Sequence, residues 1–365
     1  MTKPKTIQVI TRPTGGGAEI LVRELGNRVS DHGFDSEVIY FNTDSSGAQH
    51  FSPNENETVL GVSNRSLKAI WMLRAEFQKR VDKSEKVIVH AHLTWAFFYV
   101  ALASIGLDIK LIYTEHNTTN KRRKIPFFQY IERFFYGRYA KIICISEGTK
   151  DSLDAWIGQN LSANTQVVQN GSRIYEYKNR ESHDGILKFV SVGSLTYKKG
   201  FETAIKALAM LEDKQWTYKI IGEGPEREKL QNLINELRLG KNIELVGWSE
   251  EIEKHLNDAD IQLIPSLWEG FGLVAVEGMS TGLPIVASNV DGLREVLDKQ
   301  NLAVFLVDDY KNPGAFSVKI KECINAWNKE ATKMAKASRD QSEKFSMDSM
   351  VCGYVEVYKK VLEIE

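Results

Sequence analysis

The chain has 365 residues, of which 42% are hydrophobic and 26% charged, and its formal net charge is -1. This length is too great for one comfortable hydrophobic core and indicates two domains, at roughly 150 residues per domain. The balanced composition argues against a disordered, fibrous or membrane-spanning chain, and the near-zero net charge gives no reason to expect nucleic acid as a partner.

The cysteines and the beginning of the chain indicate a compartment. Cys144, Cys323 and Cys352 are far apart and odd in number, which fits neither a disulfide framework nor a metal site and favours a reducing environment. The first residues run straight into a strand-like stretch at 6–11, without the apolar core of a secretory signal. The longest apolar stretch, 93–107, is shorter than the roughly 18 residues of a membrane-spanning helix. We therefore expect a cytoplasmic protein.

In the first half of the chain, short apolar runs rich in β-branched residues alternate with longer helical patterns. The predicted strands are 7–10, 87–89, 110–113 and 142–145, and the predicted helices are 18–30, 93–104 and a stretch that begins at Glu147. Such alternation is typical of βαβ units on a parallel sheet that is covered on both faces. Residues 1–172 are therefore predicted to form one doubly wound, Rossmann-like domain.

A polar stretch at 176–185 interrupts this rhythm and is the predicted linker. The alternation then restarts and predicts a second Rossmann-like domain over 173–345. Its strands are expected at 186–192, 218–221, 243–246, 261–264 and 284–287, and its helices at Phe201, after Pro225, at Phe271 and from Pro313 onward. A last helix over about 346–365 is expected to pack on one of the two domains, and periodicity leaves open which one. The fold class is α/β, with two domains facing a central cleft where ligands of open sheets bind.

The segment 265–288 carries the strongest chemical signal. It predicts a strand end, a glycine-rich loop, an apolar helix and another strand, with Glu269 in the loop and Glu277 inside the helix. A buried carboxylate without partners is costly, and ribose hydroxyls would be good partners for Glu277. Gly270 and Gly272 leave the helix N-terminus open to a diphosphate, which its free N–H groups and dipole favour. The alternative is a core helix whose Glu277 bonds only to protein.

Two further loops follow strands of the second half. In the loop that begins at Gly193, Lys198 and Lys199 place positive charge where a leaving phosphate would be stabilised. As a bare pattern, two lysines in a loop are more often solvated surface. Gly222 and Gly224 occupy the corresponding place after the next strand, where a tight turn before a helix explains them without any ligand.

In the first half, Gly16 and Gly17 belong to a run of three glycines between the first strand and the first helix. Backbone that cradles phosphate is expected at this place in such a fold. The run lacks the G-x-G-x-x-G spacing and is no Walker A loop, which disfavours a generic NAD or ATP site.

Three histidines end strands of the first half or begin the loops after them. His90 and His92 lie two residues apart and therefore share one face of their strand, and His116 precedes Asn117 after the next strand. A zinc site is disfavoured because no third ligand stands at a recognisable spacing. We interpret these side chains as hydrogen-bonding groups at the cleft.

A basic cluster precedes an aromatic-rich helical stretch at 125–136. The cluster consists of Lys121, Arg122, Arg123 and Lys124. Such a segment can lie on an anionic bilayer or hold an anionic acceptor. A solvated loop before a core-facing amphipathic helix fits the pattern equally well.

Together these motifs match a known family: the chain resembles the retaining glycosyltransferases of family 4, which have the two-domain GT-B fold. The likeness covers nearly the whole length and is strongest from Glu269 to Glu277, the family's two glutamates separated by seven residues. The resemblance implies that Glu277 holds the ribose of the donor and that Glu269 approaches the donor sugar. Backbone N–H groups of Phe271, Gly272 and Leu273 would meet the diphosphate and the sugar.

The same resemblance implies roles for other positions. Lys199 takes the place of the family's phosphate-binding lysine. Gly16 and Gly17 match a loop that closes over the donor, and His92 resembles a histidine that positions the transferred sugar. The chain departs from the family at Ser194, where arginine is usual, because serine supplies neither its charge nor its fork of donors.

The implied activity is a metal-independent, cofactor-free hexosyl transfer that keeps the anomeric configuration. The donor would be a UDP-sugar or a GDP-sugar, and the acceptor a surface polysaccharide, a lipopolysaccharide or a lipid-linked glycan at the inner face of the cell membrane. Either Lys198 compensates for Ser194, or donor binding is weaker than usual. A second hypothesis is a nucleotide-sugar-binding protein without transferase activity. A third hypothesis is another GT-B enzyme, such as a UDP-sugar epimerase.

Overall fold

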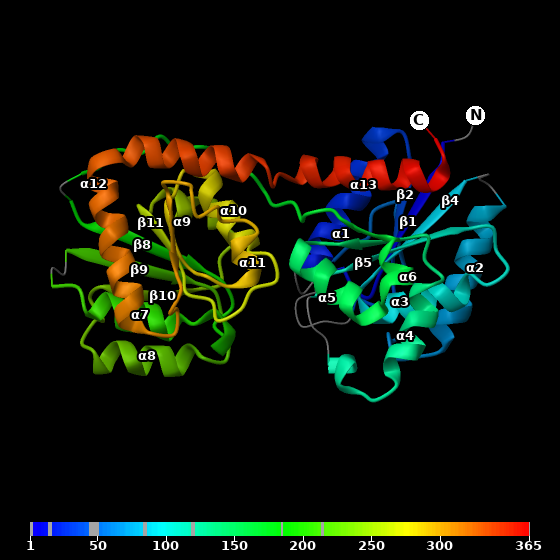
Figure 1. Ribbon diagram of the computed structural model, residues 1–365, viewed down its shortest axis with the longest axis horizontal. Helices are drawn as coiled ribbons and strands as arrows, with labels where there is room; N and C mark the ends of the chain where they lie inside the picture. The colour runs from blue at the N-terminus through cyan, green and yellow to red at the C-terminus, as the bar shows by residue number, and fades with distance from the viewer. Residues whose placement is uncertain are drawn as a thin grey trace. The chain divides into compact units, whose positions relative to one another are not determined.

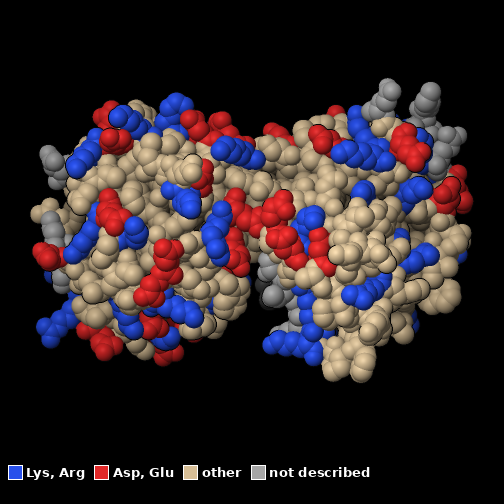
Figure 2. Space-filling view, in the orientation of Figure 1, with Lys and Arg blue, Asp and Glu red and all other residues tan. Residues whose placement is uncertain are grey.

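The computed structural model describes residues 3–13, 17–43, 51–82, 86–117, 121–183, 185–212 and 215–364. The chain forms two compact units (Figure 1). Unit 1 comprises Met1–Asn170 and Asp348–Glu365, and unit 2 comprises Gly171–Met347. On the visible face of both units, basic side chains are interspersed with acidic ones (Figure 2), in keeping with the net charge of -1.

Unit 1 is built on a seven-stranded parallel sheet in the order β3-β2-β1-β4-β5-β6-β7. Its strands are β1 (Lys5–Ile10), β2 (Asp35–Tyr40), β3 (Glu57–Val59), β4 (Val87–His92), β5 (Lys110–Glu115), β6 (Lys141–Cys144) and β7 (Thr165–Val167). Its helices are α1 (Gly17–Arg28), α2 (Lys68–Val81), α3 (Leu93–Ala103), α4 (Phe128–Tyr136), α5 (Glu147–Ile157), α6 (Gln159–Ser162) and α13 (Met347–Leu362), with 3₁₀ turns η1 (Val29–His32) and η3 (Lys121–Lys124).

The two faces of this sheet differ in chemistry. One face packs α2 to α5 into an apolar core around Phe97 and Tyr136. The other face places the polar side chains of Gln8, His90 and Thr114 beneath α13, which contributes tyrosines to them. The expected break before the last helix is present, because α12 ends at Glu343 and α13 begins at Met347. The C-terminal helix therefore covers the polar face of the unit 1 sheet.

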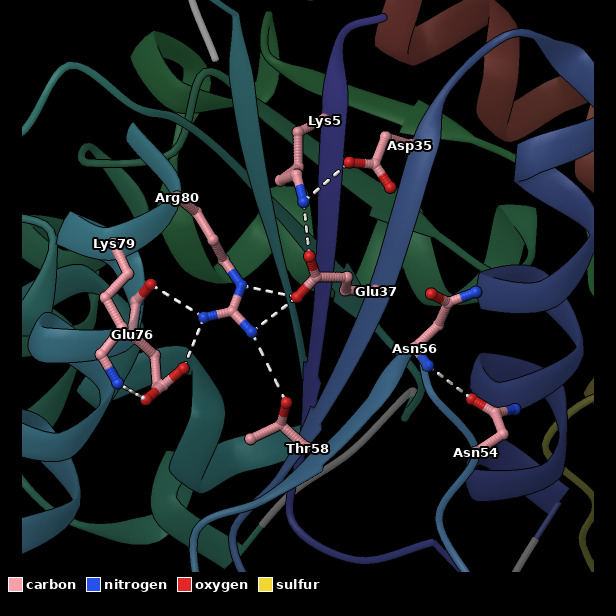
Figure 3. A network of polar contacts seen from close by, with 9 residues as sticks. All are labelled: Lys5, Asp35, Glu37, Asn54, Asn56, Thr58, Glu76, Lys79 and Arg80. Atoms are coloured by element: carbon pink, nitrogen blue, oxygen red, sulfur yellow. Dashed lines mark hydrogen bonds and ion pairs between the residues drawn. The ribbon is translucent and has the colours of Figure 1, made fainter. Parts of the chain in front are cut away.

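A cluster of charged side chains fastens α2 to the amino ends of β1 and β2 (Figure 3). Lys5 Nζ lies 2.7 Å from Asp35 and also contacts Glu37. Arg80 Nε donates to Glu37 at 2.6 Å and pairs with Glu76 on its own helix. Because ligands of open parallel sheets bind at the carboxyl ends of the strands, this cluster at the opposite end is structural.

Unit 2 is built on a six-stranded parallel sheet in the order β10-β9-β8-β11-β12-β13. Its strands are β8 (Leu187–Val192), β9 (Trp216–Ile221), β10 (Ile243–Gly247), β11 (Ile261–Ile264), β12 (Ile285–Ser288) and β13 (Val304–Val307). Its helices are α7 (Phe201–Ala209), α8 (Arg227–Glu236), α9 (Ile252–Asn257), α10 (Leu273–Ser280), α11 (Asp291–Arg294) and α12 (Pro313–Glu343), with the 3₁₀ turn η4 (Tyr197–Lys199).

Several elements differ from the sequence prediction. The predictions did not include β2, β3, α2, β7 and β13, of which β3 and β7 are only three residues long. The predicted helix at Phe271 begins two residues later, at Leu273, because Gly272 adopts a left-handed φ of 76°. Within the described ranges, no helix is long and apolar enough to cross a membrane. The three cysteines are free, with Cys352 exposed and the other two buried.

Candidate functional site

The order of strands in each sheet reverses at one place. In unit 1 the reversal lies between β1 and β4, and in unit 2 it lies between β8 and β11. Ligands of doubly wound sheets bind at such a reversal, outside the carboxyl ends of the strands. The loops after β8 and β11 carry Lys199 and Glu269, and His92 ends β4. The topology therefore assigns the most reactive predicted residues to the expected binding edges.

Lys199 and Glu269 form an ion pair in unit 2. Lys199 Nζ lies 2.5 Å from Glu269 Oε2, and the two side chains are only 14% and 18% exposed. Ser266 Oγ donates to the same carboxylate oxygen at 3.3 Å. A main-chain hydrogen bond of 2.8 Å from Leu267 N to Lys198 O joins the two loops. An anion that binds Lys199 must therefore compete with the carboxylate of Glu269.

Glycines allow the neighbouring loops of unit 2 to approach closely. A Cβ on Gly222 would lie 2.0 Å from Gly193 O, and one on Gly224 would lie 2.4 Å from Leu195 O. Gly193 has a φ of 153°, and a Cβ built on it would lie 3.3 Å from Cε of Lys199, so the missing side chain leaves room for the aliphatic part of that lysine. Close packing thus accounts for Gly222 and Gly224 without a ligand. Gly193 shapes the surroundings of the lysine.

Gly292 packs closely against the loop that carries Glu269. A Cβ at Gly292 would lie 2.3 Å from the Glu269 carbonyl oxygen. We expect Gly292→Ala to lower the free energy of unfolding by about 1 to 3 kcal/mol, as overpacking against backbone does. Gly270→Ala is the matched control, since its added Cβ would have nothing within 4 Å. In thermal unfolding, the midpoint should be lower than that of the wild type for Gly292→Ala only. Equal midpoints for the two variants would contradict the packing argument.

The N-terminus of α10 is open. It begins after Gly272, and among the described residues no side chain caps it. Phe271 is buried and packs edge to face on Phe345 at 5.8 Å, so it anchors the loop from within. The first N–H groups of a helix have no intrahelical acceptor, and the helix dipole makes this end positive. The end of α10 is therefore suited to an anion such as a phosphate.

Glu277 lies in the second turn of α10 and is half-buried. Among the described residues, no hydrogen bond or ion pair reaches its carboxylate. Burial raises the pKa of Glu277 to about 7, and the charge of Arg173 acts in the opposite direction. Ser172 Oγ donates to Leu273 O at 3.3 Å and holds this segment beside α10. Arg173 was not predicted, because a single arginine after the last strand of the first half belongs to no recognisable motif.

His92 of unit 1 is 1% exposed and uses both ring nitrogens within the protein. Its Nε2 lies 2.9 Å from Gln8 Oε1, and its Nδ1 lies 3.3 Å from His116 Nε2. An amide oxygen only accepts, so His92 Nε2 carries the proton and Nδ1 accepts from His116. His116 is less buried and retains Nδ1 as an acceptor. Burial lowers the pKa of His92 well below its usual value and that of His116 to about 4, which keeps both rings neutral near pH 7.

The same network reaches the C-terminal helix. Gln8 Nε2 donates to the Tyr358 hydroxyl at 3.0 Å, and this hydroxyl lies 2.7 Å from His90 Nδ1. His90 Nε2 in turn lies 2.7 Å from Thr114 Oγ1. Both nitrogens of His90 are thus occupied, and in the described part of the chain no three His, Cys, Asp or Glu residues are grouped to hold a metal ion.

Tyr358→Phe is expected to lower the free energy of unfolding by about 1 to 3 kcal/mol, because it leaves buried groups of Gln8 and His90 without a partner. Tyr354→Phe is the matched control on the same helix, since its hydroxyl has one longer contact, 3.3 Å to Thr114 Oγ1. Urea denaturation of the two variants tests the difference. A larger loss for Tyr354→Phe would contradict it.

The remaining predicted residues lie as follows. Gly17 begins α1, and Gly16 lies outside the described residues. Ser194 is exposed, and the Asn117 N–H donates to Glu115 Oε1 at 3.2 Å. Among the described residues, these contacts point to no ligand at Ser194 or Asn117.

The predicted basic cluster is only partly available to a ligand. Lys121 begins η3, and Lys124 is exposed. Arg122 Nε donates to Glu132 at 2.7 Å, and Arg123 Nη1 donates to Ser152 Oγ at 2.6 Å. These two arginines hold η3 against α4 and α5 within unit 1.

Comparison with known proteins covers almost the whole chain. The family model "Glycosyltransferase Family 4" matches residues 15–172, and the model "Glycosyl transferases group 1" matches residues 175–341. An uncharacterized glycosyltransferase of Methanocaldococcus jannaschii is 31% identical over 295 residues, which cover 78% of each chain. An uncharacterized 41.2 kDa protein in the cps region of Klebsiella pneumoniae is 27% identical over 83% of this chain and 87% of its own.

Solved structures share the architecture. HepE of Anabaena, solved in complex with UDP and glucose, superposes with a TM-score of 0.77 at 20% sequence identity. The superposition covers 98% of this chain and all of the other. The two doubly wound sheets of this chain have the GT-B fold.

Proposed function

The chain belongs to glycosyltransferase family 4, and on this premise we propose that its sugar donor is a nucleoside diphosphate sugar, with UDP before GDP as the nucleotide. One observation carries the proposal. In unit 2, the Glu277 carboxylate has no hydrogen-bond partner among the described residues, and it lies one turn from the uncapped N-terminus of α10. The hydroxyls of a ribose can donate hydrogen bonds to this carboxylate, and the oxygens of a diphosphate can accept hydrogen bonds from the free N–H groups at the helix N-terminus.

The ion pair beside this helix suggests how the donor is received. We propose that the diphosphate replaces Glu269 as the ion-pair partner of Lys199. The carboxylate of Glu269 then accepts hydrogen bonds from hydroxyls of the donor sugar. Lys199 and the end of α10 stabilise the charge that develops on the leaving diphosphate. In the absence of donor, the pair of 2.5 Å keeps both charges satisfied.

In unit 1 we propose that His116 meets a hydroxyl of the sugar or of the acceptor. His116 uses its Nε2 in the hydrogen bond to His92, so its Nδ1 can accept a hydrogen bond from a ligand, whereas both ring nitrogens of His92 already have partners in the protein. His92, expected to position the transferred sugar, would act through its contact with His116. It is in this sense a positioning residue.

We further propose retention of configuration without a metal ion. The acceptor hydroxyl forms its bond to the anomeric carbon on the face that the diphosphate leaves, and its proton passes to the departing phosphate oxygen. Lys199 and the helix dipole supply positive charge to that oxygen. Product anomers determined by NMR test retention, and unchanged turnover in the presence of a chelator tests metal independence.

For the acceptor we propose a saccharide of a surface polysaccharide or a lipid-linked glycan, met at the inner face of the cell membrane. The relative encoded in the cps region of Klebsiella pneumoniae supports this class. The exposed aromatic side chains of α4 support contact with a membrane.

The decisive experiment compares UDP, GDP and ADP by thermal shift and then assays a panel of the corresponding sugars. The nucleotide that binds stabilises the protein in proportion to saturation. Products formed with donor alone identify an epimerase, and tight binding without turnover across the panel identifies a protein that only binds nucleotide sugars. Either result would overturn the transferase assignment to this donor class.

A further inference from the structure

The helix α4 and the residue before it turn an apolar side toward solvent. The α4 stripe, as we call it, consists of Phe127, Tyr130, Ile131 and Phe134, which are 81%, 66%, 50% and 68% exposed. Their spacing of three, four and seven residues places them on one side of the helix. The inner side instead holds Glu132 and Tyr136, which are 0% and 1% exposed. The helix therefore has apolar side chains on its exposed side as well as on its inner side, where Phe135 also packs against the apolar core.

Polar contacts on the inner side fix this orientation. Glu132 accepts from Arg122 at 2.7 Å and from Trp156 Nε1 at 2.6 Å. The Tyr136 hydroxyl donates to Glu115 at 3.0 Å. Turning the stripe inward would leave these buried groups unpaired, and an unpaired buried carboxylate is costly. The predicted core-facing helix is present, because Phe135 and Tyr136 pack on the apolar core, but the helix also carries a second apolar side that is exposed.

Positive charge surrounds the stripe. Residues 121–141 contain seven Lys or Arg and one acidic residue, Glu132, in a chain whose overall charge is -1. Arg122 and Arg123 are bound inward, but Lys124 and Arg138 are exposed at the two ends of the stripe. The segment with η3 and α4 projects from unit 1 in Figure 1, and the surface there is mostly uncharged in Figure 2.

We propose that the α4 stripe inserts into the interfacial layer of an anionic lipid bilayer, with Lys124 and Arg138 against the headgroups. An aromatic and aliphatic side with basic residues at its ends is the pattern of helices that lie in the membrane interface. This proposal deepens the proposed function. It rests on that function only for the purpose of membrane binding, because a lipid-linked acceptor would be met at the bilayer surface. A second copy of this chain fits less well, since a self-complementary contact would bring the same basic ends together.

The test is flotation of the full-length protein with phosphatidylcholine vesicles that contain or lack phosphatidylglycerol. The variant carries Phe127→Ser, Tyr130→Ser and Phe134→Ser. Its matched control carries Leu67→Ser and Trp71→Ser, because these side chains at the start of α2 are 69% and 75% exposed in the same unit. We expect the stripe variant to lose about tenfold or more of its vesicle binding, the control to keep it, and the wild type to prefer anionic vesicles.

Several results would overturn the proposal. Unchanged binding of the stripe variant, or equal losses in both variants, would show that the stripe is not the membrane contact. A wild-type dimer that dissociates in the stripe variant would identify a protein interface instead. The thermal shift with UDP is measured on all three proteins, so that a failure of donor binding is distinguished from a failure of membrane binding.

Discussion

Lys199→Ala is expected to lower kcat for sugar transfer by about a hundredfold or more, the loss that follows removal of one group that stabilises developing negative charge. The variant removes the cation proposed to face the leaving diphosphate. It also leaves the Glu269 carboxylate, 2.5 Å away in the wild type, without its ion pair at the place proposed for the donor. Initial rates at saturating donor, together with KM, measure the effect.

Two variants make this result specific. Lys198→Ala removes a neighbouring charge whose side chain is exposed, and we expect a much smaller change. Lys199→Ala combined with Glu269→Gln removes the uncompensated carboxylate, and we expect it to restore part of the donor affinity but not kcat. If Lys198→Ala were the more damaging variant, Lys198 would be the residue that compensates for the arginine missing at Ser194.

Much of unit 2 follows from local sequence signals. β11 coincides with its predicted strand, because Ile261, Leu263 and Ile264 form a short apolar run between Asp260 and Pro265. The position of Glu277 inside an apolar helix was likewise visible from its neighbours. The contact of Lys199 with Glu269 was not, since 70 residues separate the partners and only the order of strands brings their loops together.

Unit 1 shows where sequence periodicity fails. The pattern predicted that His90 and His92 share a face, and they do, with ring centroids 4.1 Å apart. The tyrosine that joins His90 to Gln8 lies 350 residues from that glutamine, beyond any local signal. For α4, the period of the apolar residues gives a stripe but not the direction in which it points, and Glu132 determines that direction through contacts on two other elements.

The ionisation of Glu277 is expected to make donor affinity depend on pH. Burial raises the pKa of Glu277 from an ordinary 4.5 to about 7, so the folded protein binds more protons than the unfolded chain between these values. The free energy of unfolding therefore falls as pH rises through this window, by up to about 3 kcal/mol in total from this group. Ribose hydroxyls donate to the ionised carboxylate and should lower its pKa.

Donor binding consequently favours the ionised form, and affinity should fall as pH drops below about 7, approaching about tenfold per pH unit. Glu277→Gln should weaken binding at pH 8 by about ten- to a hundredfold, the loss of a charge-assisted hydrogen bond, and should remove the slope. Titration calorimetry with the nucleotide sugar is the measurement, because its esterified diphosphate does not titrate in this range. His116, with a pKa of about 4, does not contribute there either. Parallel slopes for the wild type and Glu277→Gln would show that another group governs the pH dependence.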